Sequence, residues 1–142
     1  MGQFPPSVPD VGEPAWLERF RRLALALPEA SEQDHWGRPS FRVGKRIFAT
    51  LWPDDGKAMI KLTPDQQDEH VEEQPQTFVP VPGGWGLQGA TFVMLRGKGA
   101  AGQALLEKML LIAWRNAAPK TLAKSLDQPK RSAELKKANR KG

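Results

Sequence analysis

The sequence predicts an α+β protein in which helices pack on an antiparallel sheet of about five strands, in the order α-β-β-β-α-β-β-α. Two observations lead to this prediction. Helix-periodic apolar patterns flank the central part of the chain, and the strand-like segments between them come in runs of three and two rather than in regular βαβ alternation. At 142 residues the chain has the length of one domain, so one hydrophobic core is expected.

The first predicted element is an amphipathic helix that begins near Pro14 and is ended by Pro28. Its apolar stripe consists of Trp16, Phe20, Leu23, Ala24 and Leu27. Residues 1–13 are rich in Pro and Gly with little apolar periodicity, which predicts a disordered N-terminal extension. The single domain is therefore expected to span residues 14–123.

A three-stranded antiparallel meander should follow the helix. Phe41 and Val43 alternate with Arg42, and Gly44-Lys45 predicts a tight turn into the next strand.

The second and third strands of this meander are Ile47–Trp52, which is almost wholly apolar and therefore central, and Lys57–Leu62. The turn signal Pro53-Asp54-Asp55-Gly56 joins them. In the third strand the alternation puts Ala58, Ile60 and Leu62 on one face and Lys57, Met59 and Lys61 on the other.

The second half of the chain predicts two helices around two strands. Thr63-Pro64-Asp65-Gln66 has the form of a capping box that starts a short acidic helix ending near Gln74. Phe78–Val81 is expected to be an edge strand, because Pro80 cannot donate to a central ladder. A strand at Thr91–Arg96 follows.

The last predicted helix runs from about Ala101 to Ala117 and is ended by Pro119. Its buried stripe is expected to consist of Leu106, Met109, Leu110, Ala113, Trp114 and Ala117.

Positive charge is concentrated in the C-terminal tail. Residues 119–142 carry eight Lys or Arg and two acidic side chains, whereas residues 1–118 carry 13 basic and 14 acidic ones. Residues 124–142 are low in apolar side chains and are predicted to form a flexible basic tail. Such a tail either binds polyanions without sequence preference or only keeps the protein soluble.

Several classes of site are not expected. Cysteine is absent, and the histidines His35 and His70 have no partner at helical spacing, so no metal site is predicted. No serine stands in a nucleophile-elbow context, which leaves the chain without a recognisable catalytic site. No cofactor is expected. The N-terminus lacks the pattern of a signal peptide and no apolar run is long enough for a membrane span, so a cytoplasmic location without a membrane partner is expected.

Two glycine-rich segments are of interest. Gly97-Lys98-Gly99-Ala100-Ala101-Gly102 matches G-x-G-x-x-G between a predicted strand and a helix, but no second parallel strand follows it. It is either a plain connection or a small anion site at Gly97, Lys98 and Gly99. The loop Pro82-Gly83-Gly84-Trp85-Gly86 either shapes the backbone around Trp85 or presents that side chain to a ligand.

Basic residues also gather in the first three strands and their approaches. These residues are Arg38, Arg42, Lys45, Arg46, Lys57 and Lys61, with Trp36 and Met59 nearby. By alternation, one sheet face could carry the cations that phosphates need, beside aromatic rings on which bases stack. The alternative is an ordinary solvated strand face.

Several motifs, in the same order, resemble the MmcQ/YjbR family of small bacterial proteins. They are His35-Trp36-Gly37-Arg38-Pro39-Ser40-Phe41-Arg42-Val43, Ile47-Phe48-Ala49, Lys61-Leu62, Pro82-Gly83-Gly84-Trp85-Gly86 and Ala118-Pro119-Lys120. The resemblance covers about residues 16–123. It implies a compact α+β fold similar to that of type III secretion chaperones, and a family usually labelled DNA-binding. Trp36, Arg38, Phe41, Lys61 and Trp85 occupy motif positions.

The sequence thus favours a non-enzymatic nucleic-acid-binding protein, with DNA as the expected partner. The binding residues would be those of the basic strands and of the tail: Trp36, Arg38, Arg42, Lys45, Arg46, Lys57, Lys61, Trp85, Lys120, Lys124, Lys130 and Arg131. One alternative is a chaperone-like module that binds a protein through Trp36, Trp52 and Trp85. Another is a small-anion binder or unrecognised enzyme that uses the Gly97–Gly102 segment.

Overall fold

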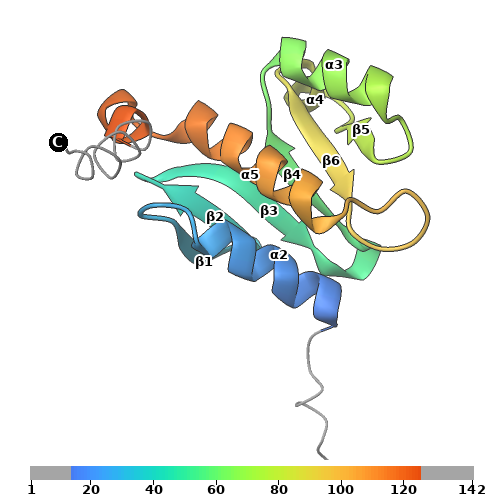
Figure 1. Ribbon diagram of the computed structural model, residues 1–142, viewed down its shortest axis with the longest axis horizontal. Helices are drawn as coiled ribbons and strands as arrows, with labels where there is room; N and C mark the ends of the chain where they lie inside the picture. Colours follow the sequence, from blue (N-terminus) through green and yellow to red (C-terminus); the bar gives the residue numbers. More distant parts are fainter. Residues whose placement is uncertain (1–13, 126–142) are drawn as a thin grey trace, which may run out of the picture.

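The computed structural model describes residues 14–125, which form a six-stranded antiparallel sheet with helices packed on it (Figure 1). The strands lie in the order β1-β2-β3-β4-β6-β5. Their bounds are β1 Ser31–His35, β2 Arg38–Val43, β3 Arg46–Trp52, β4 Lys57–Lys61, β5 Phe78–Pro80 and β6 Ala90–Met94. The helices are α2 Ala15–Leu25, α3 Pro64–Glu73, α4 Gly84–Leu87 and α5 Gln103–Ala117, with a 3₁₀ turn at Pro53–Asp55. This confirms the α+β class.

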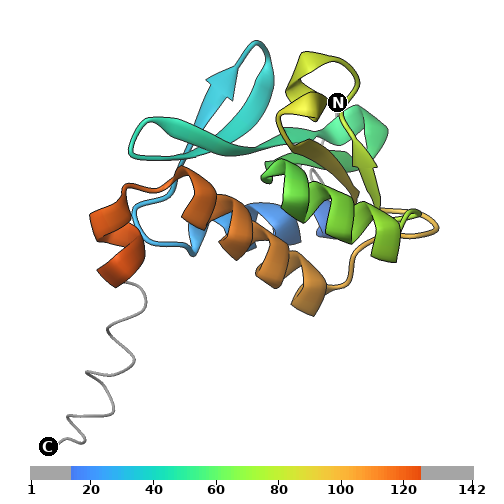
Figure 2. The same ribbon diagram turned by 90° about the horizontal axis from the view of Figure 1, so that it is seen from above.

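The two faces of the sheet are covered differently. Figure 2 shows α2, α3 and α5 on one side, and α4 with the curled β1–β2 hairpin on the other. We call the first side the covered face and the second the open face. The open face presents every second residue of the strands, among them Arg42, Thr50, Trp52, Lys57, Met59, Lys61 and Phe92.

The core lies between the covered face and the helices. All six residues of the stripe predicted in α5 are buried. Phe20 of α2 meets Phe41 of β2 edge to face, with ring centroids 5.6 Å apart. The indole of Trp114 is fully buried and donates a hydrogen bond of 3.0 Å to the Pro28 carbonyl, so its polar atom is satisfied inside the core.

The stripe predicted for the first helix is partly wrong. Phe20 and Ala24 are buried as expected, but Leu17 is the third buried residue of α2, whereas Trp16 is only partly covered. The helix ends at Leu25, three residues before the proline expected to end it.

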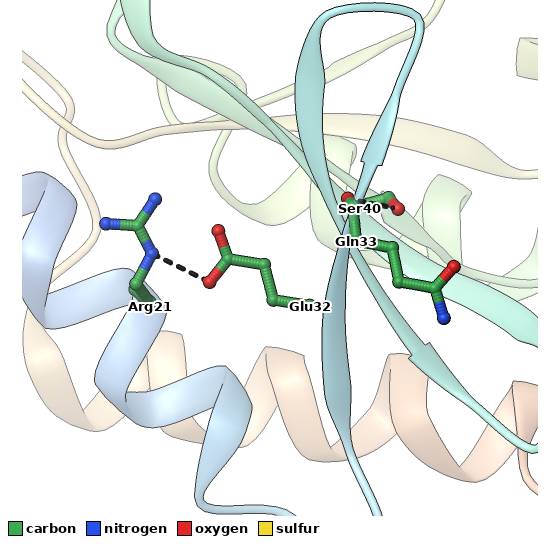
Figure 3. Close-up of polar contacts among 4 residues, drawn as sticks. All are labelled: Arg21, Glu32, Gln33 and Ser40. Atoms are coloured by element: carbon green, nitrogen blue, oxygen red, sulfur yellow. Dashed lines mark hydrogen bonds and ion pairs between the residues drawn. The ribbon is translucent and has the colours of Figure 1, made fainter.

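Strand β1 was not predicted. Its residues, Ser-Glu-Gln-Asp-His, contain no apolar alternation, because the strand lies at a sheet edge and is only partly covered. Polar contacts fix it in place (Figure 3): Arg21 Nε of α2 lies 2.8 Å from Glu32 Oε1, and Ser40 Oγ donates 2.9 Å to the Gln33 carbonyl. The sheet therefore has six strands instead of about five.

Tight turns join the first three strands. Trp36 and Gly37 have φ of 56° and 81°, and Gly44 and Lys45 have φ of 57° and 83°. Two consecutive residues with positive φ are typical of the two-residue turn that matches the twist of a hairpin. The predicted turn at Gly44-Lys45 and the meander around it are confirmed.

The remaining elements agree with the sequence apart from their ends. Gln66 N donates to Thr63 Oγ1 and Thr63 N donates to Gln66 Oε1, which completes the predicted capping box of α3. Strand β5 lies at the sheet edge, as Pro80 requires. Strand β6 ends at Met94 rather than Arg96, and α5 begins at Gln103 rather than near Ala101. No helix between residues 14 and 125 combines the length and apolarity needed to cross a membrane.

Candidate functional site

Two adjoining hollows lie over the open face of the sheet and around its end next to α5. The face hollow, of about 370 Å³, lies over the middle strands and is lined by Thr50, Trp52 and Met59 among others. The end hollow, of about 650 Å³, extends toward the β2–β3 turn and the C-terminal end of α5. The hollows share the lining residues His35, Ile47, Lys61 and Trp85, so they form one continuous depression.

Three tryptophans surround the face hollow. Trp36 is 90% exposed and Trp85 is 55% exposed, whereas Trp52 is partly covered. Trp52 is fixed by its Nε1, which donates 3.0 Å to Thr50 Oγ1, and by an edge contact with Phe92, whose ring centroid lies 5.0 Å away. The hollow thus has one immobilised indole in its wall and two indoles free to meet a ligand.

The backbone conformation of Trp36 is unusual for its residue type. Its φ of 56° lies in the left-handed region, which costs a non-glycine residue about 1–2 kcal/mol. The turn is supported by Asp34 Oδ2, which accepts a hydrogen bond of 3.2 Å from Gly37 N. An indole exposed to this degree gains little packing energy in return.

Cationic side chains lie beside these rings. The Arg38 guanidinium carbon lies 3.6 Å from the centroid of the Trp52 ring, and Lys57 Nζ lies 3.9 Å from that of Phe92. Arg42 Nε donates 3.2 Å to Ser40 Oγ. The remaining basic lining residues, Lys45, Arg46 and Lys61, are exposed.

No carboxylate lines either hollow among residues 14–125. The structure brings five of the predicted cations into the walls of the hollows, and Lys57 lies beside Trp52 and Phe92. Since the lining contains no Asp or Glu between residues 14 and 125, its side chains carry a net positive charge.

The glycine-rich loop places Trp85. Part of this predicted loop is helical, because Gly84–Leu87 forms the short helix α4. A β carbon on Gly86 would lie 1.6 Å from the Val81 carbonyl oxygen, so only glycine fits there. Gln67 of α3 is buried and donates from Nε2 to the carbonyls of Gly86 and Ala90, at 3.1 and 3.0 Å. The loop therefore shapes the backbone and also presents Trp85.

The chain after α5 begins beside the end hollow. A β carbon built on Gly44 would lie 3.4 Å from the Pro119 ring, so Pro119 packs against the β2–β3 turn. Residues 120–125 are helical, with Lys120 and Lys124 exposed. Lys130, Arg131, the remainder of the predicted flexible tail and the predicted extension at residues 1–13 lie outside the described residues.

The Gly97–Gly102 segment is separate from the two hollows. Its turn is stabilised by Thr77 Oγ1, which donates 2.7 Å to the Gly99 carbonyl, and by Ala101 N, which donates 2.9 Å to the Met94 carbonyl. Gly97, Lys98 and Gly99 line neither hollow. An anion site there stays a separate prediction.

No group of three or more His, Asp or Glu side chains between residues 14 and 125 is arranged to hold a metal ion. His35 lies in the wall of both hollows. His70 is buried in α3, where its ring contacts Phe78 edge to face at 5.5 Å between centroids.

Among the lining residues that were missing from the predicted site are His35, Thr50 and Trp52. His35 was missed together with β1. The alternation of β3 contained a signal for the other two, because Thr50 and Trp52 pair with Met59 and Lys57 across the strand and so share their face.

Comparison with known proteins agrees with this architecture. Residues 25–116, which include all six strands and Trp85, match the family model YjbR. None of the curated proteins compared with the chain matches it. The crystal structure of Deinococcus radiodurans protein DR2400, with a DUF419 domain, has 19% sequence identity and a TM-score of 0.59, over 70% of this chain and 76% of that one. At this identity the likeness shows a common fold.

The family model covers more than half of the chain, and within that part lie the motifs His35–Val43 and Pro82–Gly86, which here form the walls of the hollows. This protein is a member of the YjbR family.

Proposed function

We propose that this protein binds nucleic acid without catalysing a reaction, that DNA is its ligand, and that the open face is its binding surface. The observation that carries the proposal is the composition of the two hollows. Cations and tryptophans surround one continuous depression, and no lining residue between residues 14 and 125 is a carboxylate. Phosphates and bases are the ligand groups that complement such a surface.

The positions of the cations support phosphate binding. Arg46 of β3 and Lys61 of β4 are exposed and both line the end hollow. Lys120 and Lys124 are exposed in the segment that follows α5, and the last residue of α5, Ala117, lines the end hollow. A nucleic-acid backbone lying across the end hollow would therefore continue toward the basic residues that follow α5.

The proposed activity is binding, because the lining side chains are suited to contact rather than to chemistry. They are cations, aromatic rings, amides and apolar groups, with His35 as the one lining histidine in the described chain and no lining carboxylate to act with it.

The direct test is fluorescence anisotropy of labelled DNA, single-stranded and duplex, titrated with the full chain over a salt series. The test variant is Arg46→Gln/Lys61→Gln, and the matched control is Arg22→Gln/Lys108→Gln. The control removes the same two charges from exposed positions on the helices α2 and α5, which lie over the covered face.

The two variants should separate location from net charge. Each phosphate contact contributes a slope of about −0.9 to log K against log salt on duplex DNA, and about −0.7 on single strands. The Arg46→Gln/Lys61→Gln variant should lose affinity at physiological salt and flatten the slope by about 1.4 to 1.8. The control should retain the wild-type slope. Equal effects of both variants, or absence of salt-sensitive binding, would refute the proposal.

Docking of a protein is the second candidate. Leu87 is 83% exposed and lies in α4 together with Trp85, so this helix presents two exposed apolar side chains. A protein ligand bound there would depend on Leu87 and the tryptophans and would be insensitive to Arg46→Gln/Lys61→Gln.

A further inference from the structure

We propose that the open face selects single-stranded over duplex nucleic acid, by taking an unpaired base into the face hollow and the adjoining phosphates into the end hollow. The inference rests on the proposed function and specifies its ligand. The face hollow is lined by aromatic and apolar side chains, which suit a base, and the end hollow contains most of the cations, which suit phosphates.

The face hollow suits a base. Its lining includes Thr50, Trp52 and Met59, and its volume of about 370 Å³ lies within the roughly 300–1,000 Å³ of ordinary ligand pockets. Trp36 and Trp85 line it with exposed indoles. Every base has a flat π face, so stacking on such rings tolerates any base sequence.

The end hollow suits phosphates. Its cations are Arg42, Lys45, Arg46 and Lys61, and the last of these also lines the face hollow. Lys61 therefore stands where base and backbone would separate. Arg38, stacked on Trp52, leaves its guanidinium edge available to hydrogen-bond the base or its phosphate.

A duplex cannot use this arrangement. Its bases are paired and stacked inside the helix, and only their edges are accessible from the grooves. A base that stays paired inside the duplex cannot enter the face hollow between Trp36, Trp52 and Trp85. Unpaired bases can turn outward, and aromatic side chains recognise them in that state.

The conformation and exposure of Trp36 also favour a single-stranded ligand. A residue at φ of 56° with 90% exposure contributes strain and little packing in the free protein. Stacking on a bound base would bury the indole. Ligand binding would then account for a strained, exposed tryptophan that packing within the protein does not explain.

The test compares three labelled probes of about ten nucleotides, a length within the usual site sizes of single-strand binders. They are a single-stranded oligonucleotide, a duplex of the same sequence, and a single strand of abasic sites that keeps the phosphates. With the full chain at one salt concentration, the ordinary single strand should bind at least about ten-fold more tightly than either other probe.

Tryptophan variants locate the effect. Trp36→Ala and Trp85→Ala should each weaken single-strand binding by about 5- to 150-fold while the salt slope stays unchanged, because no cation is removed. Leu87→Ala is the matched control, since Leu87 is also exposed but lines neither hollow, and it should bind as wild type. Both tryptophans are on the surface, so the variants should fold, which circular dichroism checks.

The outcomes distinguish this inference from the proposed function. Equal binding of all three probes would show contact with phosphates alone and would overturn the inference while the proposed function stands. Tighter binding of the duplex would also overturn the inference and leave the proposed function standing. In that case the β1–β2 hairpin would contact base edges in a groove of the duplex. Failure of every probe to bind would overturn both.

Discussion

The two faces of the sheet differ in what buries their apolar side chains. On the covered face, Phe41, Leu51 and Ile60 are fully buried under the protein's own helices. On the open face, Met59 and Phe92 are nearly as well buried, but by Trp52, Met94 and neighbouring side chains. Lys57 and Arg38 lie over the aromatic rings there.

The difference shows where a partner is still needed. The covered face is complete, because each apolar side chain has a protein neighbour. The open face is apolar at its base and cationic above it, since long basic side chains pack their stems on apolar surface and keep their charges in water. Such a surface is stable alone and remains able to bind an anion with flat apolar groups.

The largest expected loss of stability comes from a substitution on the covered face. Phe41→Ala should lower the free energy of unfolding by about 3–5 kcal/mol, because it removes a fully buried ring that contacts Phe20. Urea unfolding measures this, and nucleic-acid binding should persist wherever the variant is folded. A loss below about 1 kcal/mol would contradict the account of the core.

A smaller loss of stability is expected from a substitution in α4, the short helix on the open face. Gly86→Ala should cost about 1–3 kcal/mol, because the new β carbon collides with the Val81 carbonyl and must displace α4. Single-strand binding should fall as Trp85 moves. Gly84→Ala is the control, since a β carbon there meets nothing within 4 Å, and it should be neutral or slightly stabilising. Equal behaviour of the two variants would show that α4 is not held as described.

The smallest effect has the opposite sign and sharpens the view of the open face. Trp36→Asn should raise the free energy of unfolding by about 0.5–1 kcal/mol, because asparagine before Gly37 favours this hairpin turn. The same variant should lose single-strand affinity. If it proved less stable than wild type, Trp36 would have a structural role, for example through its edge contact with the His35 ring.

The fold could be predicted from the sequence where one face of an element is buried. The stripe of α5 and the alternation of β4 follow from the covered face, and Thr63-Pro64-Asp65-Gln66 carries its own capping chemistry. Strand β1 could not be predicted, because its pairing to β2 depends on backbone hydrogen bonds and on contacts such as Arg21 with Glu32. Such contacts leave no periodic pattern.

The candidate site was predictable in part for the same reason. Alternation placed Arg42, Lys57 and Lys61 on one side of the sheet, and the structure shows them there. The walls were not predictable. They depend on the β1–β2 hairpin and on α4, which is held by a hydrogen bond from Gln67 of α3 and by the close approach of Gly86 to Val81.

The most direct test of the open face as the binding surface uses the five tryptophans of the chain. Trp36, Trp52 and Trp85 line the face hollow, whereas Trp16 and Trp114 pack with the core. In an NMR titration of the ¹⁵N-labelled full chain with single-stranded oligonucleotide, the indole N–H signals of the first three should shift, and those of Trp16 and Trp114 should stay in place. Shifts confined to Lys120, Lys124 and the residues after them, with all five indoles unmoved, would contradict the account.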